Sequence, residues 1–303
     1  MSTDYRFLTY EELDDGRIVR IMLNRPEARN AQNRGLLVEL NEAFLRAEAD
    51  DTVRVVILGG HGPMFSSGHD LGSAVSRAEY SPGGPDQHPS FQGLGANREG
   101  AEKLMLQEWH HFFANTRRWR DLRKITIAQV HGDVYAAALM LMWACDLIIA
   151  AEGTRFADVV GTRLGMCGVE YFAHPWEFGP RKTKELMLTG DAMEVDEAYQ
   201  LGMITKVFPP HDELADKTLE FARRIAEVPT MAALLAKEAV NQTVDNMGFY
   251  NALNACFTLH QLNHSHWAQV HEEGWPVGLE SDGLPNWKTA PADRASGQGP
   301  GPR

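Results

Sequence analysis

The sequence predicts an α/β fold in which helices pack on a largely parallel sheet. Through the first half of the chain, short apolar runs typical of strands alternate with helical segments. Such an alternation is typical of βαβ units, whose strands pair in parallel. From Pro180 onward the apolar residues recur at helical spacing alone. We therefore expect a layered core followed by a helical C-terminal part.

Four strands are expected in the core. Residues 17–23 alternate between polar and apolar, and residues 53–58, 125–130 and 147–151 are short apolar runs. The helices are expected at residues 35–49, 100–122 and 136–144 of the core, and at 183–188, 195–201, 213–226, 231–244 and 249–271 of the C-terminal part.

The chain divides into three expected parts. Residues 1–208 form the α/β core, and Pro209 and Pro210 mark the boundary to a helical segment over residues 209–275. Residues 276–303 are rich in proline and poor in apolar side chains, which predicts an exposed tail. Residues 81–95 are rich in Pro, Gly, Ser and Gln, which predicts a mobile surface loop.

Composition narrows the class of protein. The 303 residues are 44% hydrophobic and 23% charged, which is ordinary for a soluble globular chain. The net charge of −12, from 29 basic and 41 acidic residues, argues against nucleic acid or an anionic membrane as partner. Three widely spaced cysteines and the lack of an apolar leader favour the cytoplasm. The longest apolar run, residues 134–145, is too short to span a membrane.

Four motifs occur in a fixed order along the chain. They are LNRPEARNA at residues 23–31, FSSGHDL at 65–71, the segment from HG to ACDLIIAA at 131–151, and LTG followed by AYQLGMI within 188–204. Together they resemble the motifs of the crotonase, or enoyl-CoA hydratase/isomerase, superfamily. The resemblance covers residues 17–208.

The resemblance implies a fold and a ligand. The fold would be a spiral of ββα units with a helical C-terminal trimerisation segment, and the assembly a homotrimer or a dimer of trimers. The substrate would be an acyl-CoA or enoyl-CoA thioester in fatty-acid or related metabolism, with CoA as part of the substrate and no separate cofactor or metal.

The resemblance also implies an oxyanion hole made of two backbone N–H groups, those of His69 and Ala137. Each such donor typically stabilises a thioester oxyanion by ~3 kcal/mol. Ala137 begins an expected helix, whose N-terminus favours negative charge. Ala136, Ala137 and Ala138 stand where the family has three glycines, and their Cβ atoms narrow the approach to the hole.

Two loops are expected to hold the CoA part of the substrate. The family's CoA contacts fall on Arg25 and Arg29, which we expect to be exposed and to reach the phosphates. The other expected contacts are Ala28, Ala31, Ser67, His69, Asp70 and Leu71.

The family's two catalytic glutamates are missing. Their positions are taken by Met140 and Val160, which cannot transfer a proton, so the standard two-glutamate mechanism does not apply. Glu170 is the best remaining base, because a carboxyl among apolar neighbours is expected to have a raised pKa. The alternative is a structural Glu170 paired with Arg163 or Arg181.

Three functions therefore stay open. The first is a reaction of the enoyl-CoA hydratase/isomerase family that uses Glu170, and the second is hydrolysis of a CoA thioester. The third is acyl-CoA binding without catalysis, which Met140 and Val160 favour.

A histidine cluster near the C-terminus suggests metal binding. His260 and His264 lie one helical turn apart, with His266 and His271 nearby. No acidic residue at a fitting spacing joins them before Glu272. We therefore expect an exposed or interface helix face and no metal site.

Overall fold

The computed structural model describes residues 5–80, 94–98, 100–209 and 211–270. In this part of the chain a six-stranded sheet has the order β1-β2-β3-β4-β6-β9, and a three-stranded sheet has the order β5-β7-β8. The strands are β1 (Leu8–Leu13), β2 (Ile18–Leu23), β3 (Val55–Gly60), β4 (Ile125–Val130), β5 (Asp133–Tyr135), β6 (Leu147–Ala151), β7 (Arg155–Ala157), β8 (Met193–Glu194) and β9 (Lys206–Phe208).

The large sheet is parallel from β2 to β9, and only β1 runs antiparallel to its neighbour. This confirms the α/β class. The helices are α1 (Arg34–Ala49), α2 (Ala74–Tyr80), α3 (Gly100–Glu108), α4 (Asn115–Arg120), α5 (Ala137–Trp143), α6 (His174–Thr189), α7 (Val195–Gln200), α8 (His211–Ala226), α9 (Thr230–Asn246) and α10 (Phe249–Val270).

The alternation of side chains along the strands creates two apolar layers. Ile57, Ile127 and Ile149 point to one face of the sheet, where they pack against Leu214 and Ala222 of α8. The neighbouring residues point to the other face and belong to the larger core with α1 and α5. Both faces of the parallel strands are therefore covered, as such strands require.

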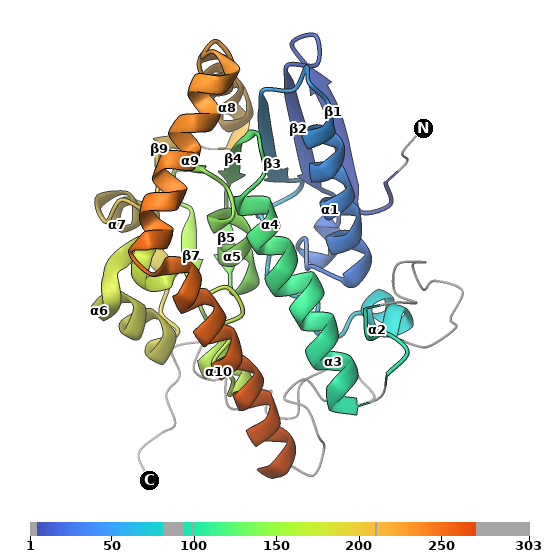
Figure 1. Cartoon of the computed structure of the whole chain (residues 1–303). Coiled ribbons are helices and arrows are strands. Elements are labelled where there is room, and N and C mark those ends of the chain that lie inside the picture. Colours follow the sequence, from blue (N-terminus) through green and yellow to red (C-terminus); the bar gives the residue numbers. More distant parts are fainter. Residues whose placement is uncertain (1–4, 81–93, 99, 210, 271–303) are drawn as a thin grey trace.

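A long helical rod runs along the molecule from α3 to α4 (Figure 1). Where the sequence predicts one helix over residues 100–122, the structure has α3, a π-helical stretch over Trp109–Ala114, and α4. In Figure 1, α10 descends beside this rod. The rings of Phe113 and Phe257 stack at 4.6 Å between centroids, which joins the two segments.

A buried ion pair anchors α9 to the core. Lys237 Nζ lies 3.0 Å from Asp146 Oδ2 and donates to the carbonyl oxygens of Leu122 and Lys124. Asp146 also accepts hydrogen bonds from the backbone and hydroxyl of Thr126. The ACD motif therefore supplies a structural carboxylate.

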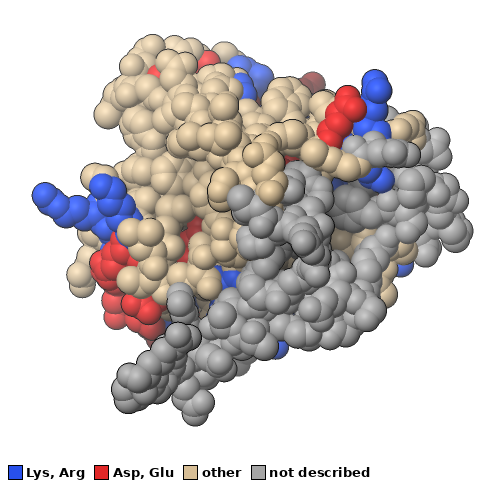
Figure 2. Space-filling view, turned by 90° about the horizontal axis from the view of Figure 1, so that it is seen from below, with Lys and Arg blue, Asp and Glu red and all other residues tan. Residues whose placement is uncertain are grey.

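The charged side chains of the described surface are dispersed. Seen from below, Lys and Arg side chains lie in separate small groups, and no continuous basic face appears among the residues described in this view (Figure 2). None of the helices in the described ranges is both long and apolar enough to cross a membrane. The predicted tail, 276–303, and most of the predicted loop, 81–95, lie outside the described residues.

Candidate active site

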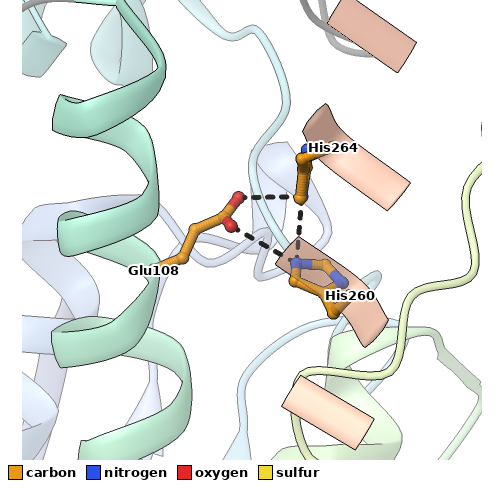
Figure 3. A group of neighbouring side chains, drawn as sticks. All are labelled: Glu108, His260 and His264. Carbon is orange, nitrogen blue, oxygen red and sulfur yellow. Dashed lines mark hydrogen bonds and ion pairs between the residues drawn. The ribbon is translucent and has the colours of Figure 1, made fainter. Parts of the chain in front are cut away.

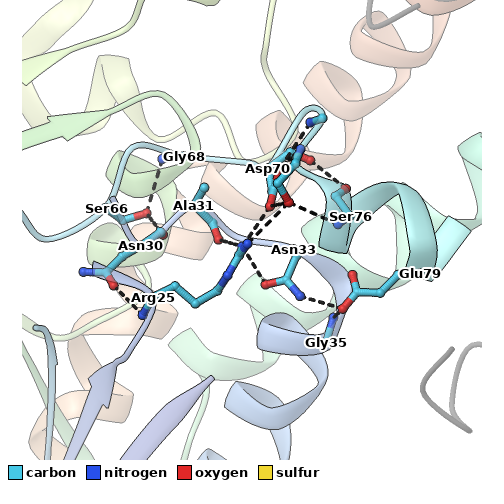
Figure 4. A network of polar contacts seen from close by, with 12 residues as sticks. Arg25, Asn30, Ala31, Asn33, Gly35, Ser66, Gly68, Asp70, Ser76 and Glu79 are labelled. Carbon is cyan, nitrogen blue, oxygen red and sulfur yellow. Dashed lines mark hydrogen bonds and ion pairs between the residues drawn. The ribbon is translucent and has the colours of Figure 1, made fainter. Parts of the chain in front are cut away.

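A buried polar network ties together the two loops that carry the first two motifs (Figure 4). Arg25 Nη1 lies 2.8 Å from Asp70 Oδ2, and both side chains are only 4% exposed. The same nitrogen donates to Asn33 Oδ1 at 2.9 Å. Arg25 was expected to be exposed, and this expectation is wrong: the guanidinium is enclosed because it neutralises Asp70 and holds the second loop against the first.

Gly68 permits a close approach between the second loop and the start of α5. Its φ of +93° is in the left-handed region, which favours glycine. A Cβ added there would lie 2.9 Å from the carbonyl oxygen of Tyr135 and 3.2 Å from the backbone nitrogen of Ala137. Gly68 also donates its N–H to Ser66 Oγ, which fixes the turn. The residue after Gly68 is thereby brought next to the first residue of α5.

Two backbone donors face this junction. Among the hydrogen bonds of the described residues, neither the His69 N–H nor the Ala137 N–H has a protein acceptor. Ala137 is the first residue of α5, where backbone N–H groups lack partners within the helix. Ala136 before it has φ +51° and ψ −121°, a strained conformation for an alanine. The pair can hold the oxygen of a thioester as it gains negative charge.

A cavity of about 230 Å³ opens beside these donors. Its wall is mainly apolar and includes Val160, one of the two residues expected at the family's glutamate positions. The predicted site residues on its wall are Ser67, His69, Leu71, Ala137 and Glu170. Ala28, Arg29 and Ala31 lie on the neighbouring loop, which the Ser67 N–H joins by a hydrogen bond to the Arg29 carbonyl.

Comparison with known proteins identifies the family of the chain. A family model described as enoyl-CoA hydratase/isomerase matches residues 14–93 and 91–275. The chain belongs to this family. It is 65% identical over 291 residues to "Putative enoyl-CoA hydratase EchA13" of Mycobacterium tuberculosis, which covers 96% of this chain and 91% of the relative.

Solved structures of the enoyl-CoA hydratase/isomerase family have the same fold. A probable enoyl-CoA hydratase from Mycobacterium smegmatis superposes with a TM-score of 0.77 at 39% identity, covering 89% of this chain and 99% of that one. A probable enoyl-CoA hydratase from Mycobacterium thermoresistibile gives a TM-score of 0.77 at 41% identity, covering 89% and 98%. The expected crotonase-like fold with its helical C-terminal segment is confirmed.

Glu170 is the carboxylate that faces His69. His69 Nε2 lies 3.5 Å from Glu170 Oε1, and the His69 ring stacks on Phe112 at 3.5 Å between centroids. Burial lowers the pKa of His69 below its ordinary value, while Glu170 acts in the opposite direction. His69 therefore lines the cavity with its imidazole held between Phe112 and Glu170.

The raised pKa expected for Glu170 is wrong. Burial alone raises it, but positive charge at His260 and the contact with His69 outweigh burial and bring the pKa of Glu170 below its ordinary value. His260 Nδ1 lies 3.9 Å from Glu170 Oε2, and among the described residues neither Arg163 nor Arg181 forms an ion pair with Glu170. The partners that the sequence suggested were arginines, whereas the structure supplies two histidines.

A second buried group of side chains, Glu108, His260 and His264, lines the same cavity (Figure 3). His260 and His264, expected on an exposed or interface face of α10, are only 3% and 4% exposed in this chain. Glu108, the last residue of α3, packs against both of them. The expectation considered only acidic residues near the histidines in sequence, and Glu108 precedes His260 by 152 positions. The sequence placed Glu108 in a different predicted helix, at residues 100–122, and did not indicate that this helix packs against residues 249–271.

Proposed function

We propose that this chain hydrates an enoyl-CoA thioester, with Glu170 as the base and the backbone N–H groups of His69 and Ala137 as the oxyanion hole. The observation that carries the proposal is the position of Glu170 on the same cavity wall as the two donors. Glu170 stands in for the acid–base function that Met140 and Val160 cannot provide. Its lowered pKa keeps the carboxylate ionised at neutral pH, which is the form that can take a proton from water. The His69 imidazole, at 3.5 Å, orients the Glu170 carboxylate.

The proposed reaction adds the elements of water across the double bond. Glu170 takes a proton from a water molecule while the water oxygen forms a bond to Cβ. The electron pair of the Cα=Cβ bond shifts toward the thioester oxygen, where the two N–H groups stabilise the enolate. Glu170 then returns the proton to Cα, so that one water is added and the carboxylate is regenerated.

The first test is turnover of a panel of enoyl-CoA and acyl-CoA thioesters of different chain lengths, followed by mass spectrometry. Calorimetry measures binding of the same ligands and of free CoA. The proposal expects an enoyl-CoA to gain the mass of one water. Release of free CoA from a saturated acyl-CoA would point to thioester hydrolysis. Binding of every ligand without a product would point to an acyl-CoA-binding protein, and either result would overturn the proposed hydration.

For the CoA part of the substrate we propose contacts along the loop of residues 28–31 and at Ser67 and Leu71. Arg29 is the exposed cation of this loop, whereas Arg25 and Asp70 are occupied by each other. Arg29→Ala is expected to weaken binding of CoA a few-fold, because an exposed charge pair is worth only about 0.2–1 kcal/mol. Unchanged affinity would remove Arg29 from the contacts.

We propose that the C-terminal helices assemble the chain into a homotrimer or a dimer of trimers. Large apolar side chains are exposed on α9 and α10, among them Leu235 at 57%, Val240 at 62% and Leu262 at 62%. Apolar side chains gathered on one region of a surface are typical of an interface. Light scattering on the eluting protein tests this, and a monomer at micromolar concentration would contradict it. A place in cytoplasmic fatty-acid or related acyl-CoA metabolism, without nucleic acid or membrane, stays a prediction.

A further inference from the structure

Three side chains from two helices far apart in the sequence converge on the wall of the cavity. His260 Nε2 lies 3.3 Å from Glu108 Oε2, and His264 Nε2 lies 3.3 Å from Glu108 Oε1. The two Nε2 atoms are 3.0 Å apart. Figure 3 shows both rings and the carboxylate turned toward one another, with α3 on one side and α10 on the other.

We propose that Glu108, His260 and His264 bind a divalent transition-metal ion, a site that goes beyond the proposed hydration and does not depend on it. Zn–N bonds of about 2.1 Å place two ligand nitrogens of one ion roughly 3.0–3.5 Å apart. The observed 3.0 Å between the two Nε2 atoms falls in this range. Two imidazoles and a carboxylate are also the ligand types that zinc and iron(II) accept.

Hydrogen bonding alone satisfies this arrangement poorly. Each Nε2 faces both the other Nε2 and a Glu108 oxygen, so three short contacts meet at two nitrogen atoms. One N–H can point along only one of these directions. If both Nε2 atoms carry a proton, the two N–H groups face each other across 3.0 Å, and if only one does, the lone pair of the other nitrogen faces a carboxylate oxygen. A single cation at the centre would instead accept the lone pairs of both nitrogens and of the carboxylate at once.

Two further features fit a metal centre. Glu170 lies on the far side of the His260 ring, with Oε2 at 3.9 Å from Nδ1, so that a negative charge stands behind this histidine without a hydrogen bond to it. The three side chains are 4–6% exposed, yet all three residues line the cavity. An ion held by three protein ligands would therefore have an open position toward the cavity, where a water or a substrate oxygen can bind.

The test is metal analysis of the full chain, purified without chelators, by inductively coupled plasma mass spectrometry. The metal-free protein is then titrated with Zn²⁺ against a coloured chelator, and with Co²⁺ while visible d–d absorption is recorded. We expect about one ion per chain. Glu108→Gln and His264→Ala are each expected to weaken Zn²⁺ binding by about 100-fold or more.

His266→Ala is the matched control, because His266 is exposed on the same helix and is not one of the three clustered residues. It should bind Zn²⁺ like the wild type. Circular dichroism checks that each variant folds, and Glu108→Gln keeps the shape of the side chain if His264→Ala does not fold. A wild type that binds no ion, or Glu108→Gln that binds Zn²⁺ as tightly as the wild type, would overturn the site. None of these readouts uses turnover, so failure of the site and failure of the hydratase proposal are separable.

Discussion

Replacing Gly68 with alanine tests the oxyanion hole directly. The new Cβ would lie 3.2 Å from the Ala137 nitrogen and 2.9 Å from the Tyr135 carbonyl oxygen, and neither is a flexible side-chain end. The junction must therefore open by a few tenths of an ångström, which moves the Ala137 donor away from its neighbour on His69. Misplacing one oxyanion donor typically lowers kcat by about 10²–10³-fold. The φ of +93° adds a stability cost of roughly 1–2 kcal/mol.

Gly153→Ala separates these two effects. Gly153 has φ +74°, so an alanine there bears a comparable backbone cost, but its added Cβ meets nothing within 4 Å. We expect Gly153→Ala to lose about 1 kcal/mol in urea unfolding with unchanged kcat. Gly68→Ala should lose similar stability and most of its turnover. If both variants turn over alike on the substrate found by the thioester panel, the two N–H groups do not stabilise the reaction.

Three further substitutions are each measured by urea unfolding. One relieves a strained backbone conformation, and the other two each remove the cation of an ion pair. Ala136→Gly should stabilise the chain by about 1 kcal/mol, because it relieves the strain at φ +51°; no gain would mean that the strain is absent. Arg25→Met should cost roughly 3–5 kcal/mol, because it leaves the Asp70 carboxylate buried without its cation, and a loss below 1 kcal/mol would contradict this. Lys237→Met should cost about 3 kcal/mol at neutral pH, because it leaves the Asp146 carboxylate without its cation. Burial raises the pKa of Asp146, so protonation is favoured in the folded state; the Lys237→Met deficit should therefore shrink as the pH falls, and a deficit that grows would refute it.

Elements with a strong local pattern were predictable from the sequence. The runs at 125–130 and 147–151 coincide with β4 and β6, because every second residue of these strands packs on one face and the others on the opposite face. Strand β1 was not predicted, since its Tyr10-Glu11-Glu12 centre is polar and it pairs on one side only. Strands β5, β7, β8 and β9 have at most three residues, too few for a period to appear.

The site was predictable where it consists of backbone and not where it depends on tertiary contacts. The backbone donors proposed at His69 and Ala137 are inferred from the motifs alone. The pKa direction of Glu170 does not, because it is set by His260, which is 90 positions away in the sequence. The same holds for Glu108, because its two histidine partners on α10 come within reach only through the packing of α10 against α3.

The most direct test of the proposed chemistry is the turnover of Glu170→Gln on the substrate identified by the panel. Glutamine keeps the size of the side chain but cannot take a proton from water, so kcat should fall by about 10²–10⁴-fold while the Kd of the CoA thioester stays within a few-fold. Glu185→Gln, which alters an exposed glutamate of α6, should leave both values unchanged. A Glu170→Gln variant that retains the kcat of the wild type would show that Glu170 is not the base.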